Sequence, residues 1–116
     1  ITNPRQELDV IELYDMSTWH EARFYEDMHL CGENECGKLI TERATWPDGE
    51  IPVNPSGGVV CTNAIGQSAM ARIAEAAVQV RGDGGERQIP NVKTAMGNGI
   101  GGDNYCTAAL FKKSLV

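Results

Sequence analysis

The sequence has no apolar run long enough to cross a membrane. A spanning helix needs about 18 to 20 consecutive apolar residues, and no window of the 116-residue chain approaches this. Residues 1–8 also lack the basic and apolar regions of a secretory signal peptide. We therefore expect a cytoplasmic protein that makes no contact with a membrane.

Basic residues are too few and too scattered for a nucleic-acid surface. The chain carries 10 Lys and Arg against 16 Asp and Glu, which gives a net charge of −6 at pH 7. Binding to a phosphate backbone relies on clustered basic side chains. Nucleic acid is therefore not an expected partner.

Paired metal-ligand motifs are also missing. Cys31 and Cys36 are separated by four residues, but a structural zinc site usually takes four ligands in two close pairs. The sequence offers no second pair, so we expect no metal. The even number of cysteines would suit two disulfides in a secreted domain, yet nothing indicates export, and free thiols are expected.

Length and hydrophobic patterning favour one α/β domain. The order strand, helix, loop, helix, strand, strand indicates a mixed sheet covered by helices. Strands are predicted over 8–14, 91–96 and 105–112, and helices over 17–30 and 67–81.

The two predicted helices have different boundary signals, an N-cap for the first and a glycine stop for the second. The first begins at Ser17 or Thr18, either of which can act as N-cap, and is expected to bury Ala22, Tyr25 and Met28. The second ends before Gly82, a typical stop, and its apolar positions are Met70, Ile73, Ala74, Ala77 and Val80.

The connection over 31–58 is rich in Gly, Pro, Asn and charge, which predicts turns and short extended pieces. Its length is unusual and suggests a functional loop or a docking surface. Directly after it, residues 59–61 read Val-Val-Cys, which is typical of a buried strand.

Several motifs resemble the C-terminal signature of thiolases. These are Val-Asn-Pro-Ser-Gly-Gly at 53–58, Asn-Ala-Ile-Gly at 63–66, Gln-Val-Arg-Gly at 79–82, Glu-Arg-Gln-Ile at 86–89 and the glycine-rich run at 97–102. The resemblance covers nearly the whole chain. It is strongest to sterol-carrier-type and archaeal-type thiolases and to the related steroid side-chain aldolases.

This resemblance implies a thiolase-like layered fold of which the chain is only the C-terminal half. Residues 1–4 resemble an internal join of that family. We therefore expect 1–116 to be a partial domain that lacks its first strand, its first helix and the N-terminal half. The remaining part of the subunit is then a necessary partner.

The resemblance also implies an acyl-CoA acyltransferase that forms or cleaves a carbon–carbon bond next to a CoA thioester. The CoA thioester is the substrate, and no covalently bound cofactor is expected. The nucleophilic cysteine of such an enzyme is expected in the missing half, so this chain alone is expected to be inactive. Two alternatives stay open: a retro-aldolase acting on a β-hydroxyacyl-CoA, and a catalytically degenerate structural subunit.

Two candidate catalytic residues depart from the family pattern. Tyr14 stands where thiolases have His or Asn, and its phenol can donate a hydrogen bond or act as an acid. The alternative is a strand-end tyrosine whose hydroxyl is satisfied by backbone. Asn63 stands in place of a histidine, and the alternative is an N-cap of the helix over 67–81.

The third candidate is the final turn, where Gly97 or Asn98 stands at the position of a Cys or His. We take Asn98 as catalytic and the amides of Gly99, Gly101 and Gly102 as part of an oxyanion hole. An ordinary hairpin turn is the alternative. His20 directly follows the Tyr14 motif, so it either points to the site or faces solvent.

The resemblance further implies assembly. Thiolases commonly work as homodimers, often with a small partner that combines an OB-fold and a zinc ribbon. We expect the same kinds of partner here.

Overall fold

The computed structural model describes residues 1–63, 66–102 and 105–114, and within them it has the expected α/β architecture. Two residues of the thiolase-like motif, Ala64 and Ile65, lie outside the described residues. Helices in the described part of the chain are all too short or too polar to span a membrane. The elements, in chain order, are α1 (Pro4–Glu7), β1 (Val10–Glu12), α2 (Thr18–Asp27), α3 (Cys36–Thr41), α4 (Gly58–Cys61), α5 (Ser68–Arg81), the 3-10 helix η1 (Gly85–Arg87), β2 (Thr94–Gly101) and β3 (Tyr105–Lys112).

The sheet is mixed, as predicted. Its strand order is β1-β2-β3, with β1 parallel to β2 and β2 antiparallel to β3. A single parallel bridge between Ile11 and Val53 adds the segment before α4 to the outer edge of β1. The segments expected over 8–14, 91–96 and 105–112 therefore contribute to one sheet.

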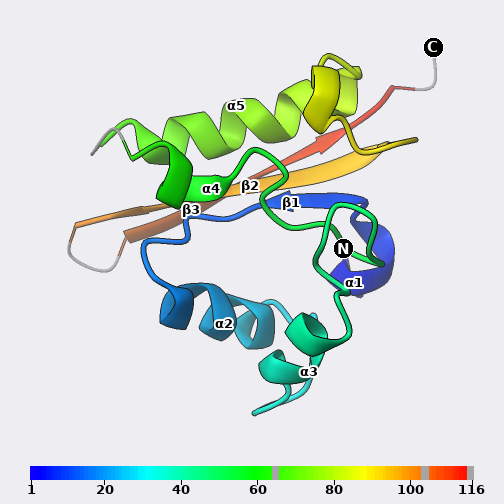
Figure 1. Ribbon diagram of the computed structural model, residues 1–116. Helices are drawn as coiled ribbons and strands as arrows, with labels where there is room; N and C mark the ends of the chain where they lie inside the picture. The colour runs from blue at the N-terminus through cyan, green and yellow to red at the C-terminus, as the bar shows by residue number, and fades with distance from the viewer. Residues whose placement is uncertain (64–65, 103–104, 115–116) are drawn as a thin grey trace.

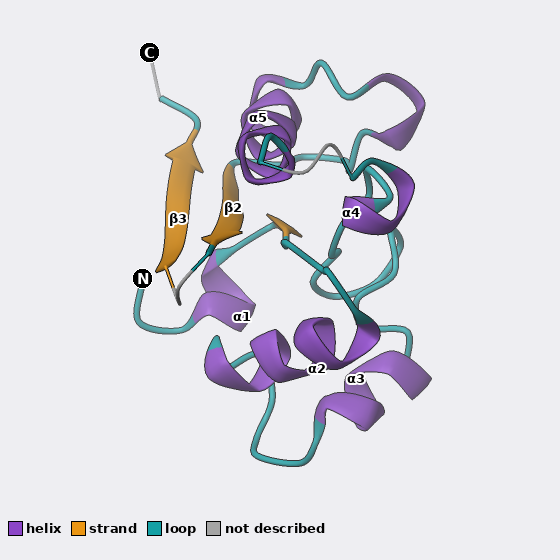
Figure 2. Cartoon of the chain, turned by 90° about the vertical axis from the view of Figure 1, so that its left-hand side faces the viewer, coloured by secondary structure: helices purple, strands orange, loops and turns teal. Residues whose placement is uncertain are grey.

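Helices cover both faces of this sheet. In Figure 1, α5 lies above the strands, and α2 and α3 lie below them; Figure 2 shows the same layers from the side. Side chains of β1 alternate between the two layers, as a strand requires. Ile11 and Leu13 join the core on the side of α2 and α3, whereas Val10 joins the core under α5.

The predicted helix over 67–81 is confirmed, and the predicted position Val80 is buried, but the rest of the buried face was only partly predicted. The left-handed Gly82, with φ of 84°, ends the helix as expected. The residues turned inward include the polar Arg72 and Gln79, whereas Met70 is 67% exposed. Gln79 is satisfied because its side chain donates to the Arg87 carbonyl and accepts from the Ile89 amide. Hydrophobicity alone therefore identifies only part of the buried face, because polar residues of α5 find buried partners.

Three other features differ from the predictions: the end of α2, the long connection and the Val-Val-Cys run. α2 has the predicted N-cap Ser17, but it ends at Asp27, earlier than the predicted residue 30, before His29 turns to a positive φ of 55°. The long connection contains α3, which buries Leu39. The Val-Val-Cys run forms α4 in place of a buried strand, which leaves Cys61 exposed and Val60 81% exposed.

The glycine-rich run was expected to be a loop, and most of it is strand. β2 continues through Gly101 and pairs with β3 along its whole length. Glycine weakens a strand, but here it permits close packing: a Cβ on Gly97 would lie 2.7 Å from the Arg72 carbonyl oxygen. A Cβ on Gly99 would overlap the Ala69 side chain. The helix thus approaches the sheet at the points where side chains are missing.

This close approach leads to a stability prediction. We expect Gly99→Ala to lower the free energy of unfolding by about 1–3 kcal/mol, the usual cost of overpacking. Urea unfolding of the full-length protein measures the loss. Adding Ala69→Gly should restore part of it, and Gly102→Ala, whose new Cβ meets no atom within 4 Å, should have little effect. Equal losses for Gly99→Ala and Gly102→Ala would contradict the packing explanation.

Candidate functional site

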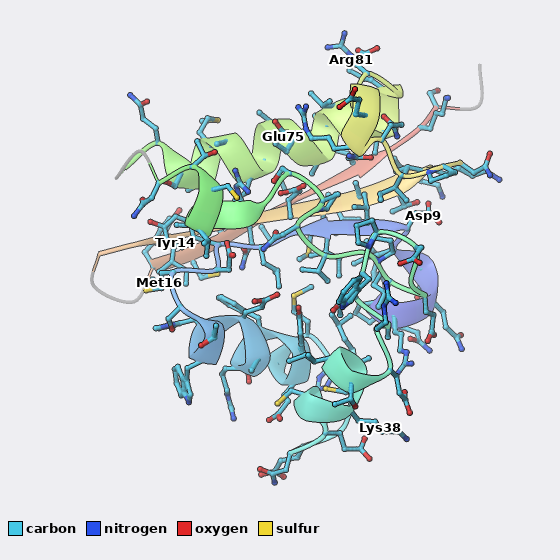
Figure 3. All side chains as sticks on the ribbon, viewed as in Figure 1. Asp9, Tyr14, Met16, Lys38, Glu75 and Arg81 are labelled. Atoms are coloured by element: carbon cyan, nitrogen blue, oxygen red, sulfur yellow. The ribbon has the colours of Figure 1, made fainter. Side chains whose placement is uncertain are left out.

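Two of the predicted catalytic residues meet just after β1 ends, beside the middle of β2. The backbone N–H of Tyr14 donates to the Asn98 side-chain oxygen at 2.6 Å. Asn98 is 3% exposed, and Tyr14 is partly buried. Figure 3 shows Tyr14 at the end of β1, beside Met16 and above α2. Asn98 therefore holds the loop that carries Tyr14, in addition to the catalytic role that the sequence suggests.

This contact also explains why β1 is shorter than predicted. The Leu13 amide donates to the side-chain oxygen of Asn54 at 2.6 Å, and the next amide donates to Asn98. Side chains thus replace a strand neighbour for these two amides. The chain leaves the sheet here, and Tyr14 is placed in a loop.

Asn63 lies apart from this contact. It is exposed, and its side-chain oxygen accepts a hydrogen bond from the Ser68 hydroxyl at 3.0 Å. The N-cap position of α5 is occupied by Gln67, without a side-chain cap, so the N-cap alternative for Asn63 is wrong. Among the described residues no hydrogen bond joins Asn63 to Tyr14, and their joint role stays a prediction.

The three glycines proposed for the oxyanion hole fall into two groups. Gly99 is buried and packs against α5, so packing is sufficient to explain it. Gly101 ends β2 and Gly102 follows it, and both are exposed. A Cβ on Gly101 would make only an ordinary contact with Tyr105 at 3.7 Å, and a Cβ on Gly102 would meet no atom within 4 Å. Packing does not require glycine at these two positions, so both the predicted oxyanion role and the alternative of an ordinary hairpin turn stay open for them.

Asp15 is a site residue that sequence reasoning missed. Its side chain is buried, and one carboxylate oxygen accepts from the Val59 amide at 2.6 Å. A Cβ on Gly58 would overlap the same carboxylate, and Gly58 has a positive φ of 65°. The aspartate and the double glycine therefore fit together. The signal in the sequence was a carboxylate directly after a buried strand.

A buried ion pair lies behind this loop and was also missed. Arg72 from α5 is 2% exposed and donates through Nη1 to Glu12 Oε2 at 3.2 Å; Glu12 is 0% exposed. Ser56 completes the cluster: its hydroxyl donates to Glu12 at 2.6 Å and accepts from Arg72 at 2.7 Å. Burial raises the pKa of the Glu12 carboxyl, although the Ser56 hydrogen bond and the Arg72 charge oppose the rise.

The cluster connects three distant segments. Glu12 ends β1, Ser56 belongs to the Val-Asn-Pro-Ser-Gly-Gly loop, and Arg72 comes from α5. The Ser56 amide also donates to Glu12 at 3.2 Å. These bonds position the double glycine, and through Asp15 they position the loop that follows Tyr14. The chain thus keeps a well-built scaffold around its candidate site.

Comparison with known proteins identifies the family. A family model described as thiolase C-terminal domain-like matches residues 3–110.

The chain belongs to this thiolase C-terminal domain-like family. The expected resemblance is thereby confirmed, and the thiolase-like fold with it. Sterol carrier protein 2 of Oryctolagus cuniculus is 34% identical over 107 residues, which are 91% of this chain and 20% of that protein. Acetyl-CoA acetyltransferase of Methanothermobacter thermautotrophicus is 33% identical over 97 residues, which are 83% of this chain and 25% of that protein.

One solved structure supports the fold independently. The Ltp2-ChsH2(DUF35) aldolase superposes with a TM-score of 0.79 at 24% identity, over 97% of this chain and 28% of that chain. The thiolase-like chain thus spans about a fifth to a quarter of the relatives it matches.

Proposed function

We propose that this thiolase-like domain is part of an acyl-CoA acyltransferase that forms or cleaves a carbon–carbon bond next to a CoA thioester. The observation that supports it best is the bond between Tyr14 and Asn98, two candidate catalytic residues from distant segments. The loop bearing Tyr14 is fixed a second time where Asp15 accepts from Val59. Such preorganisation is what transition-state stabilisation needs.

A retro-aldolase acting on a β-hydroxyacyl-CoA is the second candidate. Tyr14 favours it, because this phenol is the only proton-exchanging side chain among Tyr14, Asn63 and Asn98. The structural neighbour is itself an aldolase, and its name adds weight at the level of analogy. In this reaction Tyr14 would hold or take the proton of the substrate hydroxyl.

The chain spans only about a fifth of sterol carrier protein 2, so we propose the remaining part of the subunit as its first partner. The remaining part of the subunit would supply the nucleophilic cysteine. A homodimer and a small OB-fold and zinc-ribbon protein are the further proposed partners. If no partner restores activity with any acyl-CoA, the domain belongs to a structural subunit.

Dependence on free CoA distinguishes the two enzymes. A thiolase needs free CoA to release its second product, whereas a retro-aldolase releases an aldehyde or ketone without it. We expect the full-length protein to cleave a 3-oxoacyl-CoA only when CoA is added, with product thioesters followed by chromatography. Cleavage of a 3-hydroxyacyl-CoA without CoA would instead establish the aldolase.

Tyr14→Phe sharpens this experiment. The variant keeps the ring and the backbone bond to Asn98 and loses only the hydroxyl. General acid–base catalysis contributes about 10²–10⁴-fold, so a retro-aldolase should lose that much in kcat. A thiolase that takes its proton-transfer groups from elsewhere should keep most of its activity.

A further inference from the structure

An open pocket of about 430 Å³ adjoins the loop that carries Tyr14. Its walls come from the start of α2 and from both strands of the hairpin, and they are formed by Met16, His20, Phe24, Ile100, Gly101, Tyr105 and Cys106. The volume lies within the range of small-molecule sites. Gly101, one of the proposed oxyanion residues, is part of this wall.

His20 is held in this pocket by its neighbours. Its Nδ1 lies 2.8 Å from the Ser17 hydroxyl oxygen, and its ring packs edge-on against Trp19, with 5.1 Å between the ring centroids. The backbone amide of His20 donates to the same hydroxyl oxygen at 3.3 Å. The cap of α2 therefore fixes the orientation of the imidazole. His20 does not rotate freely, as an ordinary surface histidine does.

The Ser17 contact is suited to a group that gains and loses a proton. The hydroxyl can donate to a bare Nδ1 or accept from Nδ1–H, so the bond survives in every protonation state of the ring. Nε2 has no hydrogen-bond partner among residues 1–63, 66–102 and 105–114. It is thus available to a ligand in the pocket.

We propose that His20 is the acid–base group of this protein and exchanges the α-proton of an acyl-CoA thioester. The inference rests on the proposed function. In the step, the α C–H bond breaks, its electron pair stays in the enolate, and the proton moves to Nε2. The enolate oxygen faces the backbone at Gly101, and reprotonation from Nε2 reverses the step. His20 would thereby supply the proton transfer that the amides of Asn63 and Asn98 cannot perform.

Exchange of the α-protons of acetyl-CoA and propionyl-CoA in D₂O tests this directly, because it needs neither a nucleophilic cysteine nor an acceptor. The full-length protein, His20→Asn, Ser17→Ala and His29→Asn are compared by NMR. His20→Asn keeps the helix cap, since the cap bond uses the backbone amide. His29→Asn is the control, because Asn tolerates the positive φ of that exposed position.

We expect His20→Asn to slow exchange by about 10²–10⁴-fold, with an unchanged unfolding midpoint. Ser17→Ala should slow exchange less than His20→Asn does, because it removes only the hydroxyl that orients the ring, and His29→Asn should match wild type.

Two outcomes overturn the proposal, and they are distinct. If wild type exchanges and His20→Asn stays within about threefold of it, far less than general acid–base catalysis supplies, then His20 is not the acid–base group, while the proposed function stands. If wild type exchanges neither thioester, the proposed function fails and the role of His20 fails with it.

Discussion

Arg72→Met is expected to lower the free energy of unfolding by about 3–5 kcal/mol, because removing one partner of a buried ion pair leaves the other charge unpaired. Arg72 and Glu12 are 2% and 0% exposed, so water cannot replace the lost guanidinium. Methionine has a helix propensity close to that of arginine and fills much of the same volume. The measured difference therefore reports mainly the loss of the charge. Urea unfolding of the full-length protein measures the difference.

The loss should depend on pH in a defined direction. Burial already raises the pKa of Glu12 in the folded protein, and removal of Arg72 should raise this pKa further. A carboxyl whose folded pKa lies above its unfolded value favours folding at low pH and loses that contribution as pH rises through the folded pKa. The deficit of Arg72→Met should therefore be larger at pH 8 than at pH 5.

A matched surface pair serves as control. Arg23 forms an exposed i,i+4 pair with Asp27 on α2, and such pairs contribute only about 0.3–0.5 kcal/mol. Arg23→Met should therefore have a small effect. The double replacement of Glu12 and Arg72 by methionine should recover much of the loss, because apolar residues can replace a buried pair. Similar losses for Arg72→Met and Arg23→Met would show that the buried cluster of Glu12, Ser56 and Arg72 adds nothing to the free energy of unfolding beyond what a surface pair adds.

The buried cluster of Glu12, Ser56 and Arg72 also shows which features of the fold could be predicted from the sequence and which could not. The extent of α5 was predictable, because helical periodicity and the glycine stop are local features. Its inward face was not, because Glu12 lies 60 positions before Arg72 and only the fold reveals their pairing. An arginine in a helix is ordinarily read as exposed.

The candidate site shows the same limit. Tyr14 and Asn98 were expected in one site from the family resemblance, but the bond from the Tyr14 amide to the Asn98 side chain spans 84 positions and could not be predicted. Asp15 was overlooked, because its partner is a backbone amide that carries no sequence signal. The glycines at 97 and 99 were interpreted as a loop, because the close approach of α5 depends on tertiary packing.

The exposed surface leads to the last prediction. β3 pairs on one side with β2, and no strand pairs with its other side among the described residues. Tyr105 and Leu110 on this strand are more than half exposed. Val60 on α4 and Met70 on α5 are more than half exposed as well. An unpaired strand edge with apolar side chains is a template for association. These surfaces suit the proposed remainder of the subunit.

We therefore expect the chain 1–116, expressed alone, to associate or to unfold without cooperativity, which sedimentation and thermal unfolding would detect. Leu110→Lys should reduce the association, because a lysine on an edge strand opposes strand pairing. Ser114→Lys, which adds the same charge beyond the end of β3, should not. A soluble monomer that unfolds cooperatively would instead show that these residues need no further segment. In that case the exposed edge of β3 would be tolerated by the chain itself, and the proposal that another part of the subunit covers it would have to be abandoned.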